Sequence, residues 1–475
     1  MKSSGCRLLT NRRFLLFGAI ASLLQLTFMT RRLYQAILMV GDAQSIIRDS
    51  PQLAGQSNTF RGGLNMTSTL CTPDTSSTDH VRQYRFDRLK SLSEKMVVKR
   101  ILLGNNTALE QGALEDSSAM SGMKSHESPY VICEFVNRKG YAHFPHTLEQ
   151  LYPCFSYWRQ HNAAIHNPSG RKEKFQPLPK TSPITKQAVL VQRFASMRER
   201  TFQQNKQPPK SFVPGLKQAL QEVFQVQILD DYPTLPSNVK LESQHSFWQE
   251  VVTMEEDEDQ PYYVEDPQDM MDLRNGILDH YFGHSFRLRA SSCHSSGLAA
   301  NNTDIDRGHV SIKPRVGILN RNETRSLLNV QDIVGVVKDY LGEDTSVTVA
   351  LFENADFLSQ VDFFAQHDIV LSPHGAQLVG IPFLPSCASL LEIFPKGYWV
   401  PSFFASLAQI SNHSIRYLYL GGPGKQREEE LEELSKDPPT RMATRKRSLC
   451  PPLEKIQQGL VQVVQDWQQC CGYNG

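Results

Sequence analysis

The chain has 475 residues, 40% hydrophobic and 21% charged, a composition typical of globular proteins that excludes a disordered or fibrous chain. Its length allows two or three domains. The formal net charge of +1 excludes a strong overall attraction to nucleic acid, and no basic stretch is interleaved with aromatic residues, so we expect no nucleic-acid partner.

The first predicted element is an uncharged apolar segment, residues 14–30, with a pair of arginines on each side. Its length is at the short end of what spans a bilayer. Basic residues before it place the N-terminus in the cytosol. We therefore expect a cytosolic tail (1–13), a single-pass type II membrane anchor and a lumenal catalytic part, in the Golgi or the endoplasmic reticulum. A cleaved signal peptide is the alternative.

The cysteines and glycosylation sequons agree with a lumenal location. Eight of the nine cysteines follow the apolar segment, an even number that suits disulfides in an oxidising compartment. The adjacent Cys470 and Cys471 can hardly bond to each other, so we expect each to have a separate partner or one to stay free. The N-x-[ST] sequons begin at Asn65, Asn105, Asn301, Asn322 and Asn412.

The next part of the chain is predicted to be a stem followed by a first α/β domain. Residues 31–129 are rich in Ser, Thr, Asp and Gln, which favours a partly ordered stem with a possible helix at 81–103. We expect an N-terminal Rossmann-like (acceptor) domain at 130–290. Its predicted strands are 131–136, 186–194 and 261–266, and its predicted helices are 141–158, 214–226 and 270–283.

Residues 291–475 show a regular alternation of strand and helix patterns. The predicted strands are 315–320, 346–352, 368–372, 388–394 and 415–420. The predicted helices are 330–342, 357–366, 376–384 (which Pro382 must shorten or bend), 402–411 and 453–469. The charged segment 421–450 is expected to be an exposed insertion. Such alternation implies βαβ units and a parallel sheet, with ligands beyond the carboxyl ends of its strands.

Two motifs in this second domain carry chemistry. Ser372 ends a strand, and the turn His374-Gly375-Ala376 opens a helix whose free N–H groups favour phosphate. Glycine lets the backbone approach a ligand. His374 can donate to a phosphate oxygen or to a leaving group. The alternative is a turn histidine that only caps the helix.

The second motif follows an earlier strand of the same domain. Asn320 ends that strand, and Arg321 and Arg325 are four residues apart, so they can converge on one anion if the loop is partly helical. Guanidinium groups hold phosphate in a bidentate manner. The alternative is a pair of solvated surface arginines.

Together these motifs resemble glycosyltransferase family 61. The residues that carry the resemblance read N-R-x-x-x-R-x-x-x-N from Asn320, D-I-V-x-S-x-H-G-A-x-L from Asp368, and then F-L-P and L-L-E-I-F-P. The match covers residues 316–419, with a weaker match upstream in the H-F-x-x-x-x-L-x-x-L-x-P pattern that begins at His143. Gln377 replaces the small residue that the family usually has after H-G-A.

The resemblance implies a GT-B-type enzyme, with two Rossmann-like domains facing a cleft, that moves a sugar with inversion. N-acetylglucosamine or a pentose would pass from a UDP-sugar to a hydroxyl of a glycan or glycoprotein. The expected catalytic residues are His143, as the base, and His374, with Glu134 and Glu149 as rival bases. The expected donor-binding residues are Asn320, Arg321, Arg325, Ser372, His374, Gly375, Ala376 and Glu392, the last contacting a ribose or sugar hydroxyl.

We expect no obligatory cofactor or divalent metal, because enzymes of this type often use positive residues in place of a metal. Asp304-Ile305-Asp306 has the D-x-D form of a metal-bound sugar-nucleotide site, but it lies in a polar linker and chance explains it better. A glycan on Asn322 would crowd the donor site, so we expect Asn322 to be unmodified.

Two other classes of function remain open. One is a catalytically inactive protein of the same fold that binds a nucleotide sugar or a carbohydrate. The other is a serine hydrolase using Ser372, which the absence of a G-x-S-x-G elbow disfavours.

Overall fold

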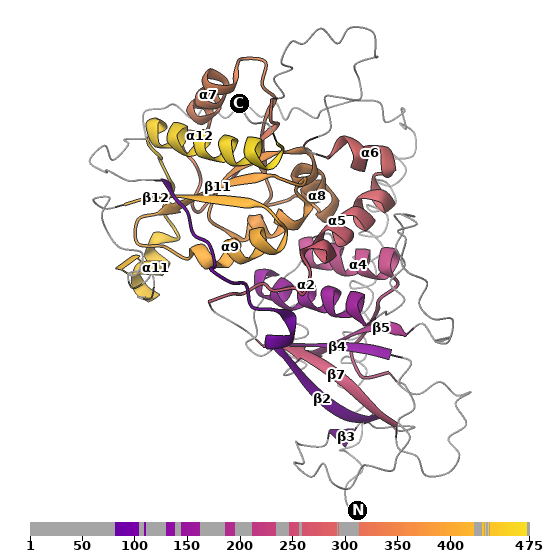
Figure 1. The fold of residues 1–475 in the computed structure, drawn as a ribbon. Helices are drawn as coiled ribbons and strands as arrows, with labels where there is room; N and C mark the ends of the chain where they lie inside the picture. Colours follow the sequence, from indigo (N-terminus) through magenta and orange to yellow (C-terminus); the bar gives the residue numbers. More distant parts are fainter. Residues whose placement is uncertain are drawn as a thin grey trace, which may run out of the picture. The chain divides into compact units, whose positions relative to one another are not determined.

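The structure, a computed structural model, contains two sheets with helices packed on them, and all described residues belong to one unit of the chain, residues 66–475 (Figure 1). It describes residues 81–103, 109–110, 130–137, 144–161, 186–194, 211–233, 247–255, 259–291, 293, 313–421, 430–431, 433, 436 and 438–472. The predicted anchor at 14–30 lies outside these ranges. Within them, no helix is long and apolar enough to cross a membrane.

The first sheet confirms the predicted run of parallel strands in the C-terminal part of the chain. Its strand order is β1-β12-β11-β10-β8-β9, and only β1 runs antiparallel to its neighbour. The strands are β1 (Val81–Arg82), β8 (Val316–Asn320), β9 (Val347–Leu351), β10 (Ile369–Pro373), β11 (Ser389–Pro395) and β12 (Ser414–Leu420).

Helices cover both faces of this sheet, as its continuous apolar strands require. On one face, α7 (Val330–Leu341) and α12 (Leu453–Cys470) pack on side chains such as Leu391 and Ile393. On the other face lie α8 (Phe357–Gln366), the 3₁₀ helix η5 (Ala376–Phe383) and α9 (Pro401–Ile410), against Leu390 and Phe394. Figure 1 shows α12 and α9 on opposite sides of β11.

The second sheet has the order β3-β2-β7-β4-β5-β6. Strands β4 (Tyr130–Asn137), β5 (Gln187–Phe194) and β6 (Gln227–Leu229) are parallel, and β7 (Phe247–Met254) is parallel to β4. Strands β2 (Met96–Leu103) and β3 (Leu109–Glu110) complete it as antiparallel partners. Its helices are α2 (Phe144–Gln160), α4 (Phe212–Phe224), α5 (Pro267–Tyr281) and α6 (His284–Arg289).

Two predictions for this sheet are wrong. The segment 261–266 is a buried loop rather than a strand, and the strand lies upstream at β7. Proline at position 261 lacks the N–H that a ladder needs. The possible helix at 81–103 is instead β1, a 3₁₀ turn (Leu92–Glu94) and β2. Residues assigned to the stem therefore add β1 to the first sheet and β2 and β3 to the second.

The helices of the second sheet pack directly on those of the first. The Tyr152 hydroxyl of α2 donates to the carbonyl of Val379 (3.0 Å), and Nε of Arg274 in α5 donates to the carbonyl of Phe383 (3.0 Å). Both acceptors belong to η5, the helix that follows the predicted His-Gly turn. One apolar core contains buried side chains from both sheets.

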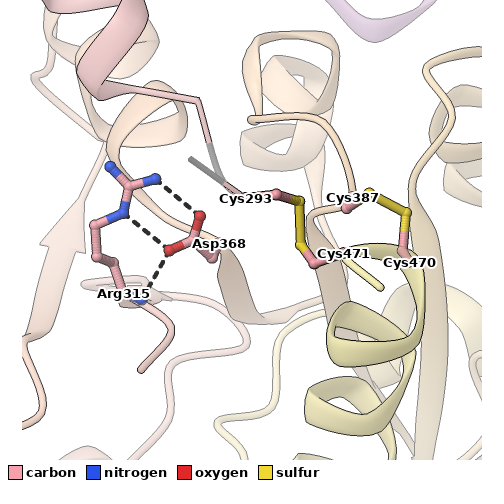
Figure 2. The surroundings of a disulfide bond; sticks show 6 residues. All are labelled: Cys293, Arg315, Asp368, Cys387, Cys470 and Cys471. Atoms are coloured by element: carbon pink, nitrogen blue, oxygen red, sulfur yellow. Dashed lines mark hydrogen bonds and ion pairs between the residues drawn. A yellow bond between two sulfur atoms is a disulfide. The ribbon is translucent and has the colours of Figure 1, made fainter. Parts of the chain in front are cut away.

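Disulfides fix the C-terminal end of α12. Cys470 bonds to Cys387 and Cys471 bonds to Cys293, so the prediction of separate partners for the adjacent cysteines is confirmed (Figure 2). A further disulfide joins Cys133 to Cys154. The sulfurs of Cys293, Cys387 and Cys471 lie within 4.8 Å of one another, but a disulfide sulfur is not the thiolate that binds a metal.

A buried ion pair joins the starts of two central strands. Arg315, before β8, donates through Nε and Nη2 to the carboxylate of Asp368, before β10, at 2.9 and 2.8 Å (Figure 2). The backbone N–H of Arg315 donates to the same carboxylate at 2.9 Å. Such a bidentate pair fixes the register of the two strands that carry the predicted motifs.

Candidate functional site

The loop after β8 is closed by Asn320. Its Oδ1 accepts from the N–H groups of Arg321 (2.8 Å) and Leu327 (2.7 Å), and its Nδ2 donates to the Leu327 carbonyl (3.1 Å). The side-chain amide is thus used within the loop, which gives Asn320 a positioning role. The loop is irregular rather than helical, and Arg325 has a left-handed backbone with φ of 59°.

The loop brings Arg321 and Arg325 together at Gly375. A Cβ added to Gly375 would lie 2.5 Å from Nη1 of Arg321 and 3.7 Å from Cζ of Arg325. The backbone of Gly375 is extended (φ 165°), so its conformation does not require glycine. The missing side chain instead makes room for the Arg321 guanidinium. The two arginines converge although their loop is not helical, so the four-residue spacing is not what brings them together.

Both guanidinium groups are largely removed from water. Arg325 is only 6% exposed, and its Nε and that of Arg321 are buried without a hydrogen-bond partner in the described part of the chain. Burial, with repulsion from Arg321, lowers the pKa of Arg325 to about 10. Burial also lowers the pKa of Arg321. Two adjacent, desolvated cations of this kind form a site for an anion.

His374 lies beside this arginine pair and is held from three directions. A hydrogen bond of 2.6 Å joins its Nδ1 to Oε1 of Glu392, and its Nε2 is 3.2 Å from the Tyr398 hydroxyl. The ring of Phe394 stacks on it at 4.8 Å. Burial and the neighbouring Arg325 lower the pKa of His374 well below its usual value, so the imidazole is neutral at physiological pH.

Glu392 stands behind His374 on the adjacent strand. Its side chain is fully buried, one oxygen contacts His374, and the other is buried without a hydrogen-bond partner among the described residues. Burial raises the pKa of Glu392 well above its usual value. The carboxyl group is therefore placed to fix the ring and tautomer of His374, as paired carboxylates do for histidines elsewhere.

Ser372 and Ala376 have local roles in the turn. Ser372 is 1% exposed; its hydroxyl donates to the Pro373 carbonyl (2.9 Å) and accepts from Nε2 of Gln377 (2.8 Å). These bonds leave its hydroxyl engaged in the turn rather than with a histidine, which does not support the serine hydrolase hypothesis. Ala376 is the first residue of η5 and is half-buried.

The predicted base, His143, and the Asp304–Asp306 motif lie outside the described residues, so the structure does not test them. Glu134 contacts Lys99 (2.5 Å) and Tyr232 (2.8 Å) on the face of the second sheet opposite its helices. That face lies away from the core shared with the first sheet, so Glu134 is not near His374.

Of the two rival bases, Glu149 is the better candidate, and its partner is His146, which was not predicted as a site residue. In α2, Nδ1 of His146 lies 2.6 Å from Oε1 of Glu149, and the histidine side chain is 43% exposed. The His146 ring contacts Phe403 of α9 (5.9 Å), whose neighbour Phe404 contacts His374 (5.4 Å). The i, i+3 spacing of His146 and Glu149 on a predicted helix was the signal available in the sequence.

Comparisons with known proteins agree with this arrangement. A family model described as Glycosyltransferase 61 matches residues 141–391, which is more than half of the chain and includes both arginines and His374. Alpha-1,3-arabinosyltransferase XAT3 of Oryza sativa subsp. japonica is 33% identical over 90 residues, 18% of this chain and 15% of the relative. Alpha-1,3-arabinosyltransferase XAT2 of the same organism is 34% identical over 89 residues, 18% and 14% of the two chains. The chain thus matches only about one seventh of the length of these relatives.

Proposed function

Because this chain belongs to the glycosyltransferase 61 family, we propose that it transfers a sugar from a UDP-sugar to a hydroxyl of a glycan or glycoprotein. The observation that carries the proposal is the convergence of Arg321 and Arg325 at Gly375, each with an Nε that is buried without a hydrogen-bond partner among the described residues. A diphosphate supplies the negative charge that these groups lack.

In the proposed reaction the acceptor oxygen attacks the anomeric carbon with inversion. The bond between that carbon and the UDP oxygen breaks, the acceptor proton passes to a base, and UDP leaves with the bonding electrons. Arg321 and Arg325 offset the charge that grows on the departing diphosphate. The carboxyl group of Glu392, kept protonated by burial, donates to Nδ1 of His374. The neutral ring then carries its proton on Nε2 and donates from there to a donor oxygen or through the Tyr398 hydroxyl.

Two histidines are candidates for the base. The sequence motif favours His143. The His146–Glu149 contact is the alternative, since a half-exposed imidazole beside a buried carboxylate is a common general base. A pH–rate profile separates the two: replacing the true base by alanine removes the acidic limb of the profile, whereas replacing the other leaves its shape unchanged.

The two sheets support a GT-B-type architecture, with the donor held by the first sheet and the acceptor by the second. The arginine loop and the His-Gly turn follow β8 and β10, which are adjacent parallel strands, so both lie at one edge of the first sheet. We assign the acceptor to the helices of the second sheet because His146 and Glu149 belong to α2 and His143 directly precedes that helix in the sequence.

A pentose is the first sugar to test. Both relatives are named as arabinosyltransferases, and N-acetylglucosamine is the second choice.

The segment at 14–30, the sequons and the disulfides support a lumenal enzyme with a type II anchor in the Golgi or endoplasmic reticulum. No divalent metal is needed if the arginines hold the diphosphate, so transfer should persist in EDTA.

A donor screen tests the proposal. The full chain is used because a fragment starting at residue 130 would lose strands from both sheets. UDP and UDP-pentoses should raise the melting temperature of the wild type, and Arg321→Ala should abolish that shift. A folded protein that no nucleotide stabilises would refute the transferase proposal. Binding without transfer to any acceptor would favour the inactive nucleotide-sugar-binding protein.

A further inference from the structure

The charged segment before α12 is not wholly the exposed insertion that the sequence predicts. It contains the helix α11 (Pro438–Thr444), and Leu431, Thr444 and Leu449 in it are buried. The family match ends at residue 391, so none of this segment is covered by it.

The residues after α11 pair with the arginine loop. The N–H of Arg325 donates to the carbonyl of Arg447 (3.0 Å), and the N–H of Leu449 donates to the carbonyl of Ser326 (2.7 Å). Leu327 and Leu449 form a parallel bridge. The segment 447–449 therefore runs beside the loop that carries Arg321 and Arg325.

Helix α11 packs on the turn that precedes Tyr398. Gly397 has φ of 81°, and a Cβ there would meet side-chain atoms of Thr444 (3.2 Å) and Thr440 (3.3 Å). Arg441, on the same helix, lies over the Tyr398 ring with its Cζ 5.8 Å from the ring centroid. Tyr398 in turn contacts His374.

This packing brings Arg445 within electrostatic reach of the arginine pair and Arg441 within reach of His374. Arg445 lowers the pKa of Arg321 and of Arg325 by repulsion, after the larger effect of burial. Arg445 and Arg441 also lower the pKa of His374, again after the larger effect of burial. The carboxylates that act on the buried pair are Glu353 and Glu323, on Arg321, and the buried Glu392, on Arg325.

We propose that Arg441 and Arg445 complete a four-arginine site for a diphosphate group, so that α11 forms one wall of the donor site. Arg325 is 94% buried and its Nε has no partner among the described residues, which favours an anion at this site. Four guanidinium groups exceed what one phosphate needs, and they exceed the two negative charges of a UDP-sugar by more than the three of the departing UDP. This inference rests on the proposed donor site but assigns residues that neither the motif nor the family match includes.

The test measures binding of UDP, uridine and inorganic pyrophosphate to the full-length chain by calorimetry. Arg445→Ala should weaken UDP and pyrophosphate about 10- to 100-fold, the range for a lost charge-assisted hydrogen bond. The more exposed Arg441→Ala should weaken both about 3- to 10-fold. Uridine affinity should stay within about twofold, because uridine lacks the diphosphate.

Two neighbouring cations serve as matched controls. Lys446→Ala and Arg447→Ala remove a positive charge from exposed positions of the same segment and should leave UDP affinity unchanged within about twofold. Because Arg445 repels the buried pair, Arg445→Ala should not lower the melting temperature of the free protein. A large drop in that temperature would mean that Arg445 supports the fold, and would overturn the inference.

The outcomes separate this inference from the proposed function. Normal UDP and pyrophosphate affinity in both Arg441→Ala and Arg445→Ala, with binding lost in Arg321→Ala, would overturn the inference and leave the transferase intact. Pyrophosphate binding that needs all four arginines, without binding of any nucleotide, would support the inference and remove the transferase.

Discussion

Replacing Gly375 by alanine should damage donor binding without damaging the fold. The new Cβ would lie 2.5 Å from Nη1 of Arg321, about 1 Å closer than an ordinary van der Waals contact. The Arg325 guanidinium, at 3.7 Å, would not be disturbed. Because the obstructed atom is the far end of a flexible side chain, the Arg321 guanidinium moves and the backbone stays.

The displaced guanidinium should lose one charge-assisted hydrogen bond to the diphosphate. Such a bond contributes about 1.5–3 kcal/mol, so the UDP dissociation constant should rise about 10- to 150-fold. The extended backbone accepts alanine without strain, so the melting temperature should change by no more than about 2 °C. Calorimetric titration and thermal unfolding of the full chain measure the two quantities.

A double-mutant cycle makes this prediction specific. The cycle uses an Arg321→Lys background, which keeps a positive charge and therefore measurable UDP binding. A lysine ends about where Cζ of Arg321 lies, 3.7 Å from a Cβ at position 375, so the alanine has nothing to displace and its effect on UDP affinity should disappear. An undiminished effect in that background would refute the steric argument. Gly335→Ala is the matched control: in helix α7, a Cβ there meets nothing within 4 Å. It should stabilise the protein by about 0.5–1 kcal/mol and leave UDP affinity unchanged.

Three further predictions concern the groups around the site. Asn320→Ala removes the bonds that close the arginine loop, so the free energy of unfolding in urea should fall by about 1–3 kcal/mol and UDP affinity should fall with it. Glu392→Ala removes the hydrogen bond that fixes the ring and tautomer of His374, so turnover should drop about tenfold or more while UDP affinity stays within about threefold. Burial lowers the pKa of His367 to about 4. The neutral form is needed in the fold, so stability present above pH 6.5 should fall by about 3 kcal/mol as the pH drops to 4, and His367→Gln should flatten that slope.

Much of the first sheet could be predicted because its strands are local features. Strands β8, β10, β11 and β12 are short apolar runs between turn residues, largely buried by helices, and the helices between them show the helical period. The strand β7 was missed because Gln249 and Glu250 interrupt its apolar pattern. The strand β2 was interpreted as part of a possible helix because short apolar runs suit both structures. What decides between them is pairing with β7, about 150 residues away.

Part of the candidate site could be predicted because its residues follow strands that are local features of the sequence. Arg321, Arg325 and His374 follow adjacent parallel strands, and the carboxyl ends of such strands meet at one edge. The reason why position 375 is a glycine could not be predicted from the sequence, because it depends on where the Arg321 guanidinium lies in the fold. Asn320 was expected to touch the donor, which stays a prediction; its bonds to Leu327 close the loop that carries the arginines.

The contribution of α11 depends on long-range pairing and covalent bonds rather than on local sequence. A charged stretch before a helix is usually solvated, and nothing within residues 438–449 shows that their backbone pairs with the arginine loop. Cys450, which directly follows the paired segment, is disulfide-bonded, and Cys470 and Cys471 tie the far end of α12 to Cys387 and Cys293. These bonds restrain both ends of α12, which directly follows the paired segment, and so oppose the repulsion that gathering four arginines would create. An oxidising compartment would therefore do more than stabilise the fold, since it would keep the third and fourth arginines at the donor site.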